Sequence, residues 1–122
     1  MRRAVIDIGT NTVKLLVADV AGTVVLPVTE KDATTRLGEG LNESKRLSRT
    51  GITRTVDAVA GFVAEATRLG ATDVLALTTS AAREAINRDE FLAGVRDGCR
   101  LEVRVITGEQ EEIGRASCRE RV

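Results

Sequence analysis

Residues 7–12, with the sequence DIGTNT, combine a carboxylate, a glycine and three small hydrogen-bonding side chains in one short stretch. The glycine allows close approach of the backbone, and the amides of such a turn can all point at one anion. Asp7 would end the preceding strand, where its carboxylate could hold a hydrated cation. The stretch therefore predicts a phosphate site, although Gly, Asn and Thr are also common in ordinary hairpin turns.

A second candidate is the stretch of residues 79–87, where a buried strand is expected to end in hydroxyl groups and a helix to begin. Helix N-termini attract anions through their unpaired amides, and Arg83, one turn inside, would add a bidentate donor. The alternative interpretation is ordinary capping by Ser80, with Arg83 solvated or paired with Glu84.

A third candidate is the acidic stretch of residues 107–112, TGEQEE, where a strand is expected to meet the start of a helix. The helix dipole alone favours carboxylates there, so helix-start chemistry is the simpler interpretation. One of these carboxylates could instead orient or deprotonate a water molecule. Because the chain contains no histidine, histidine-based catalysis and imidazole metal sites are excluded, and a carboxylate is its natural general base.

The composition indicates one small globular domain, since 43% of the 122 residues are hydrophobic and 30% are charged. The 18 basic and 18 acidic residues give no overall bias toward nucleic acid or membrane surfaces, so any anion site must be local. Cys99 and Cys118 lack the spacing of a zinc site or a redox pair. We expect a cytoplasmic protein that binds neither nucleic acid nor membrane.

The elements that must position these candidates begin with three strands, at residues 4–8, 13–20 and 23–30. The four residues between the first two strands suit a hairpin and are too few for a parallel crossover, which excludes a Rossmann or Walker loop. Pro27 predicts an edge or a bulge in the third strand. Polar residues 31–48 predict a connecting loop with a short helical turn.

Helical periodicity spans residues 52–69, with Ser48 or Thr50 as N-cap and Gly70 after the last turn. The elements predicted downstream are a strand at residues 74–79, helices at residues 81–87 and 89–96, and a strand at residues 101–106. Asp89 is the predicted N-cap of the second of these helices. Three antiparallel strands continued by parallel strands with helical crossovers make a mixed α/β sheet.

Four segments resemble, in order and spacing, the family of exopolyphosphatases and guanosine pentaphosphate phosphatases (Ppx/GppA). They are residues 7–12, 36–41, 79–87 and 107–111. The resemblance implies the ribonuclease-H-like fold of the actin-like ATPase superfamily, in which two such domains close on a phosphate cleft. Four ordered motifs are more specific than any one of them, so they favour the functional interpretations together.

The resemblance also implies roles for individual residues. The implied phosphate-binding residues are Gly9, Thr10, Asn11, Thr12 and Arg83. Glu111 resembles the glutamate that activates water, and Asp7 would hold Mg²⁺ or another divalent cation, directly or through water. Thr10 and Thr12 stand where family members usually have serines, so the hydroxyl group is kept.

The end of the chain departs from the family pattern. After the glutamate, family members usually continue with Ala-Arg-Leu, whereas Glu112, Ile113 and Gly114 follow here. Residues 113–122, IGRASCRERV, lack apolar periodicity and resemble a translated sequencing adapter; a genuine frayed tail is the alternative. We therefore expect residues 1–112 to be the first ribonuclease-H-like domain of a two-domain enzyme, and residues 113–122 to be non-native.

The activity implied by the resemblance is hydrolysis of phosphoanhydride bonds, with orthophosphate released from inorganic polyphosphate, guanosine pentaphosphate or both. The choice of substrate stays open, as does a homodimer of the full-length protein. The family's second phosphate loop lies in the second domain, so the 122-residue chain alone is expected to be inactive. Two alternatives stay open: a sugar or acetate kinase of the same superfamily, and a non-catalytic sensor of polyphosphate or guanosine pentaphosphate.

Overall fold

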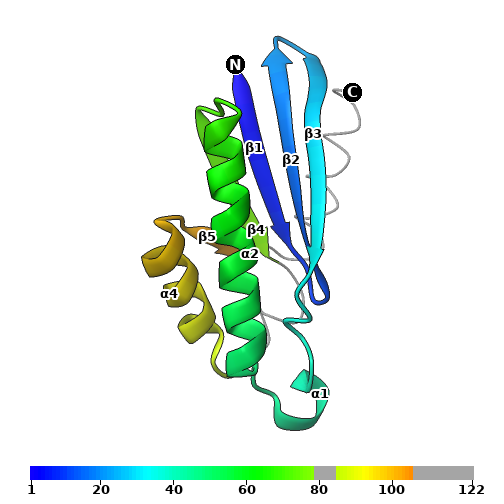
Figure 1. The fold of residues 1–122 in the computed structure, drawn as a ribbon. Helices are drawn as coiled ribbons and strands as arrows, with labels where there is room; N and C mark the ends of the chain where they lie inside the picture. The colour runs from blue at the N-terminus through cyan, green and yellow to red at the C-terminus, as the bar shows by residue number, and fades with distance from the viewer. Residues whose placement is uncertain (79–84, 106–122) are drawn as a thin grey trace.

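The chain forms one five-stranded sheet with two long helices packed against it (Figure 1). The computed structural model describes residues 1–78 and 85–105. The strands are β1 (Arg2–Ile8), β2 (Thr12–Ala21), β3 (Val24–Thr34), β4 (Asp73–Thr78) and β5 (Val103–Val105). The helices are α1 (Leu41–Ser44), α2 (Arg49–Arg68) and α4 (Arg88–Cys99).

The strand order is β3-β2-β1-β4-β5. β1, β2 and β3 form an antiparallel meander, whereas β4 pairs in parallel with both β1 and β5. This arrangement confirms the predicted mixed sheet and the short hairpin between the first two strands.

The third strand is longer than predicted, because it continues to Thr34 and takes up the first four residues of the expected loop. Its polar residues stay on the edge of the sheet, and the backbone of Lys31 pairs with Leu15 whatever the side chain does. Pro27 lies beside a register shift in this edge strand, which confirms the predicted edge or bulge.

The long helix α2 begins and ends close to where the periodicity predicts. The Ser48 hydroxyl accepts a hydrogen bond from the Gly51 N–H at 2.9 Å, so Ser48 is the N-cap rather than Thr50. Gly70 has a φ of +84° just beyond the last turn, a conformation that glycine adopts readily. The apolar stripe faces the sheet, with Ile52 and Val59 buried.

Helix α4 begins one residue earlier than predicted, and its N-cap position is held by Asn87, not Asp89. The Asn87 side chain is bonded to the Leu47 backbone instead of to the helix backbone, so local capping rules did not locate this start. Asp89 lies in the first turn, where the helix dipole favours an acidic residue. Of the helix predicted at residues 81–87, residues 81–84 lie outside the described residues and residues 85–87 are not helical.

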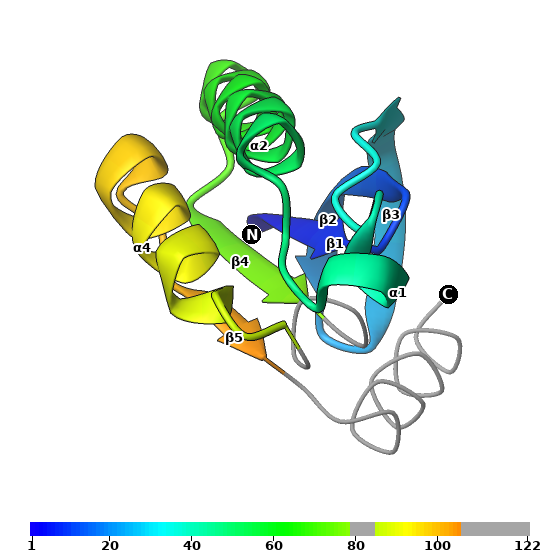
Figure 2. The ribbon, with the colours of Figure 1, turned by 90° about the horizontal axis from the view of Figure 1, so that it is seen from below.

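The core lies between one face of the sheet and the helices α2 and α4, which cover that same face (Figure 2). Alternate residues of β1 and β2 point into it, as a sheet with one packed face requires. Its largest fully buried side chains include Phe91 of α4, Ile6 and Ile8 of β1, and Leu15 of β2.

Candidate functional site

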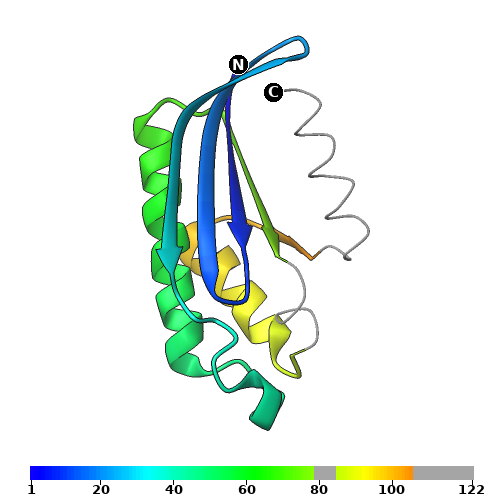
Figure 3. The same ribbon diagram turned by 90° about the vertical axis from the view of Figure 1, so that its right-hand side faces the viewer.

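The carboxyl ends of β1, β4 and β5 lie side by side at one end of the sheet, here called the carboxyl end (Figure 3). Ile8 is in register with Thr78, whose buried hydroxyl donates to the Ile8 carbonyl at 3.0 Å. Val105 is in register with Thr78 on the other side. The turn formed by residues 9–12 follows Ile8 directly, so it occupies the position where open α/β sheets commonly bind ligands.

The turn is not a standard two-residue hairpin turn. Gly9 N–H donates to the Thr12 carbonyl at 3.0 Å, but within this described turn the Thr12 N–H returns no bond to the Gly9 carbonyl. None of residues 9–12 has a positive φ, so the primed turns typical of hairpins are absent here. Glycine is needed at position 9 because a Cβ atom there would lie 2.9 Å from the Thr12 carbonyl oxygen.

A second loop, residues 35–40, clasps the turn from one side. The N–H groups of Thr35 and Arg36 both donate to the Asn11 carbonyl, at 3.0 and 3.1 Å. The Gly38 N–H donates to the Thr10 carbonyl at 2.8 Å. Three successive turn carbonyls, those of residues 10–12, are therefore tied to protein N–H groups.

The N–H groups of the turn are paired less fully than its carbonyls. Among the described residues, the Asn11 N–H has no backbone acceptor, and the Thr12 N–H has none outside the bonds between paired strands. Backbone N–H groups that are held in a turn, while the adjacent carbonyls are bonded elsewhere, can form a concave anion site. The side chains of Thr10 and Asn11 are exposed beside them and can contribute a hydroxyl and an amide donor.

The clasping loop is tightly fitted. A Cβ atom at Gly38 would lie 2.3 Å from Thr10 Cγ2, so this contact needs glycine. Arg36 has a φ of +52°, which is uncommon for a residue with a side chain. The sequence singles out residues 36–41 as one of the four segments that resemble the family, but it predicts no individual role for this loop.

The chain segments on both sides of residues 79–84 are fixed in place. Thr78 is bonded to Ile8, as described above. The Asn87 side chain accepts from the Leu47 N–H at 2.8 Å and donates to the Leu47 carbonyl at 3.0 Å. The Ile86 N–H donates to the Lys45 carbonyl at 2.9 Å. Thr78 therefore lies at the carboxyl end of the sheet, and Ile86 and Asn87 lie against the loop that precedes α2.

The structure brings together only part of the predicted site. Gly9, Thr10, Asn11 and Thr12 lie in the turn, and Asp7 lies on β1 next to it. Asp7 is in register with Lys14 of β2, which is itself in register with Asp32 of β3, so acidic and basic residues alternate across the strands. Arg83 and Glu111 lie outside the described residues.

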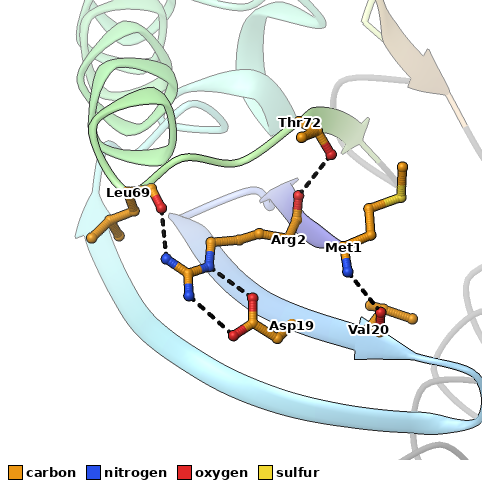
Figure 4. A network of polar contacts seen from close by, with 6 residues as sticks. All are labelled: Met1, Arg2, Asp19, Val20, Leu69 and Thr72. Carbon is orange, nitrogen blue, oxygen red and sulfur yellow. Dashed lines mark hydrogen bonds and ion pairs between the residues drawn. The ribbon is translucent and has the colours of Figure 1, made fainter.

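Other polar features of the described chain serve the fold. At the opposite end of the sheet, the Arg2 guanidinium binds both Asp19 carboxylate oxygens and also donates to the Leu69 carbonyl at 2.7 Å (Figure 4). The hydrogen bond between them raises the pKa of Arg2 and lowers that of Asp19. Burial raises the pKa of the Cys99 thiol, which disfavours its nucleophilic thiolate form. No group of three or more metal-ligating side chains occurs among residues 1–78 and 85–105.

Comparison with known proteins agrees with the geometry of the fold. The model of the Ppx/GppA phosphatase family matches residues 15–116. The chain belongs to the Ppx/GppA phosphatase family. This confirms the family resemblance and the actin-like fold. The family model begins to match at residue 15, after the turn at residues 9–12. The candidate anion site in the turn is therefore inferred from its geometry and not from the family model.

Individual relatives show how much of a Ppx/GppA protein is present. Exopolyphosphatase 1 of Mycobacterium tuberculosis is 34% identical over 112 residues, which cover 91% of this chain and 33% of that protein. Exopolyphosphatase 2 of the same organism is 36% identical over 119 residues, covering 90% of this chain and 37% of that protein. The chain thus spans about a third of the length of these relatives.

A solved structure shows the same fold. The Ppx/GppA phosphatase of Aquifex aeolicus superimposes with a TM-score of 0.87 at 33% identity, over 91% of this chain and 37% of that one. The described part of the Ppx/GppA chain contains no helix long and apolar enough to cross a membrane.

Proposed function

We propose that the full-length protein hydrolyses phosphoanhydride bonds and releases orthophosphate from inorganic polyphosphate. The observation that carries this proposal is the turn at residues 9–12. The carbonyls of residues 10–12 accept protein hydrogen bonds, whereas among the described residues the Asn11 N–H has no backbone acceptor and the Thr12 N–H has none outside the bonds between paired strands. Such a turn suits a phosphate oxygen. The exopolyphosphatase names of the Mycobacterium tuberculosis relatives support polyphosphate as the substrate, and guanosine pentaphosphate is the second candidate.

Arg83 and Glu111 complete the proposed site. Arg83 follows Thr78, the last residue of β4, by five residues in the sequence. Glu111 follows Val105, the last residue of β5, by six residues in the sequence. The strands β4 and β5 both end at the carboxyl end of the sheet. The turn and Arg83 would bind terminal phosphates, and the Glu111 carboxylate would accept a proton from the attacking water.

This division of roles matches the needs of phosphoryl transfer. The transition state is loose and carries its charge on the phosphoryl oxygens, so catalysis consists mainly of positioning and charge stabilisation. Donors fixed before the substrate arrives need no reorganisation during the reaction. The water oxygen forms a bond to the terminal phosphorus, the bridging P–O bond breaks, and the shortened chain leaves with the bridging oxygen.

The residues present would hold Mg²⁺ only together with the phosphates of a bound substrate. Among the described residues no cluster of three ligands exists, but Mg²⁺ is commonly held by one or two carboxylates together with substrate phosphates. Asp7 next to the turn would supply such a carboxylate. When bound, the ion would neutralise phosphate charge, which the neighbouring Lys14 would also do in part.

The 122-residue chain is proposed to be inactive alone. Residues 1–112 would be the first of two domains, and the partner domain, which carries the second phosphate loop in this family, would close the cleft. The chain's share of about a third of its relatives' length supports this view. Rapid magnesium-dependent phosphate release by the 122-residue chain would contradict it.

The test of the function uses the full-length protein, with phosphate release measured from polyphosphate and from guanosine pentaphosphate in parallel. Glu111→Gln should lower kcat by about 10²- to 10⁴-fold, as expected for loss of a general base. Glu109→Gln, which removes a carboxylate two residues away, is the matched control and should change kcat by less than about threefold. Equal effects of the two substitutions would reject Glu111 as the base, and absence of phosphate release from both substrates would reject the function.

A further inference from the structure

Arg54 of α2 reaches out of its helix to the loop that clasps the turn. Its Nε donates to the Thr35 carbonyl at 2.8 Å, and its Nη2 lies 3.0 Å from Glu39 Oε2. The same Nη2 is 3.5 Å from the Arg36 carbonyl, a long contact. The Arg54 side chain is partly buried, and its guanidinium bonds residues near both ends of the loop at once.

The bond to Thr35 has a consequence one peptide further along. The Thr35 carbonyl and the Arg36 N–H belong to the same planar peptide unit, so fixing the carbonyl fixes the direction of that N–H. The Arg36 N–H donates to the Asn11 carbonyl at 3.1 Å. The Asn11 carbonyl in turn shares a peptide unit with the Thr12 N–H. A continuous chain of two peptide units thus leads from the guanidinium to the candidate anion site.

A hydrogen-bonded chain of this kind fixes the direction of its N–H groups and also polarises them. A positive charge at one end polarises each peptide unit in turn, and hydrogen bonds in a chain strengthen one another. The direction of this polarisation favours anion binding. The guanidinium draws electron density toward the Thr35 carbonyl oxygen, which makes the N–H groups along the chain better donors. The positive φ of Arg36 shows that this part of the loop is held in a conformation of low intrinsic preference.

We propose that Arg54 is a positioning residue for phosphate binding. Through the Thr35–Arg36 and Asn11–Thr12 peptide units, it orients and polarises the Thr12 N–H that faces the anion. This inference rests on the proposed function, since it assumes that the turn binds phosphate. Arg54 touches no substrate in this proposal; its effect reaches the site through backbone alone.

The test combines an amide signal with steady-state kinetics in the full-length protein. The ¹H and ¹⁵N shifts of the Thr12 amide are recorded without ligand and during titration with inorganic tripolyphosphate. Arg54→Gln should move the ligand-free Thr12 amide signal and raise the KM for polyphosphate about tenfold, the effect of losing one charged hydrogen bond, while kcat stays within about twofold.

Arg54→Lys separates geometry from net charge. Lysine keeps the positive charge but lacks the fork that bonds the Thr35 carbonyl and Glu39 together. If the geometry matters, its KM should rise nearly as far as in Arg54→Gln. A KM at the wild-type value would show that only charge at this position matters and would overturn the proposal.

Arg68→Gln is the matched control, because Arg68 lies on the same helix and also loses an ion pair, to Glu65, yet contacts no residue of the loop. It should leave both the Thr12 amide and KM unchanged. Circular dichroism checks that each variant is folded, and Arg54→Lys provides a second reading if Arg54→Gln does not fold. If tripolyphosphate does not shift the Thr12 amide signal of the wild-type protein, the proposed function is rejected. If both Arg54 variants keep the full wild-type response, only the role of Arg54 is rejected.

Discussion

The contact between Gly38 and Thr10 allows a sharp test of how the turn is built. A Cβ atom at position 38 would lie 2.3 Å from Thr10 Cγ2, but at 3.4 Å and 3.6 Å from the Thr10 carbonyl oxygen and Cβ. Only the methyl group is therefore in severe conflict. Gly38→Ala should force the Thr10 side chain to rotate, and Thr10→Ser, which removes that methyl group, should make the same alanine acceptable.

The expected change in the free energy of unfolding caused by Gly38→Ala follows from three contributions. Turning Thr10 away from its preferred rotamer costs about 0.5–1.5 kcal/mol. Weakening the hydrogen bond from the Gly38 N–H to the Thr10 carbonyl costs about 1 kcal/mol. Alanine restricts the unfolded chain and returns about 0.4–1 kcal/mol, since the φ of Gly38 is not positive. Gly38→Ala alone should thus lower the free energy of unfolding by about 1 kcal/mol, and in the Thr10→Ser background it should be neutral or slightly stabilising.

Urea unfolding followed by far-ultraviolet circular dichroism is the suitable assay, because the chain contains no tryptophan or tyrosine to report by fluorescence. The four proteins of the double-mutant cycle give the coupling energy between positions 10 and 38, expected to be about 1–2 kcal/mol. Gly61→Ala is the control: it lies within α2 with nothing within 4 Å of its Cβ position, so it should raise stability by about 0.5–1 kcal/mol.

Additivity would refute the reasoning. If Gly38→Ala is equally costly with Thr10 in place and in the Thr10→Ser background, the methyl group is not what excludes alanine. If Gly38→Ala is as stabilising as Gly61→Ala, the loop does not lie against the turn at all. Tripolyphosphate titration of the same four proteins adds a functional reading, because a rotated Thr10 side chain displaces its hydroxyl from the proposed site.

Three further predictions concern stability, each measured by urea unfolding. Phe91→Ala should lower the free energy of unfolding by about 3–5 kcal/mol, because Phe91 is fully buried, whereas Leu26→Ala at an exposed position should change it by less than about 0.5 kcal/mol. Thr35→Val should be neutral or stabilise by about 1 kcal/mol, since the buried Thr35 hydroxyl has no partner among the described residues; a clear loss would show that it does have one. A hydrogen bond from Arg68 holds the pKa of Glu65 at about 2, below its ordinary 4.5, so this carboxylate stabilises the fold above pH 4.5 and loses that effect as the pH falls toward 2. Glu65→Gln should flatten the pH dependence of stability in that window; an unchanged slope would contradict the assignment.

Local sequence signals predicted much of the fold because several elements obey local physics. The apolar period of α2 and the hydroxyl of Ser48 act within a few residues of one another, so Ser48 was one of the two N-cap residues predicted for this helix. The end of β3 was missed because an edge strand is held by backbone pairing, which the polar side chain of Lys31 does not reveal. Asn87 was missed as the N-cap residue because its side chain bonds to Leu47, which lies 40 positions away in the sequence.

The candidate site divides in the same way. The turn at residues 9–12 was predicted from its residue types, whose hydrogen-bonding chemistry is local. The clasp by residues 35–40 was not, since it uses backbone N–H groups that every non-proline residue carries. The reach of Arg54 to Thr35 depends on how α2 packs after folding, so no spacing rule along the chain could show it. The roles of Arg83 and Glu111 stay predictions of the sequence.

The bond between Thr78 and Ile8 joins residues 70 positions apart, and this separation orders events during synthesis. On a ribosome the hairpin of β1 and β2 emerges before the loop and α2, while the parallel partner of β1 is still being translated. Until β4 leaves the exit tunnel, the nascent chain exposes the side of β1 that this strand will cover. A stall before that point would thus leave an open, aggregation-prone edge of the sheet.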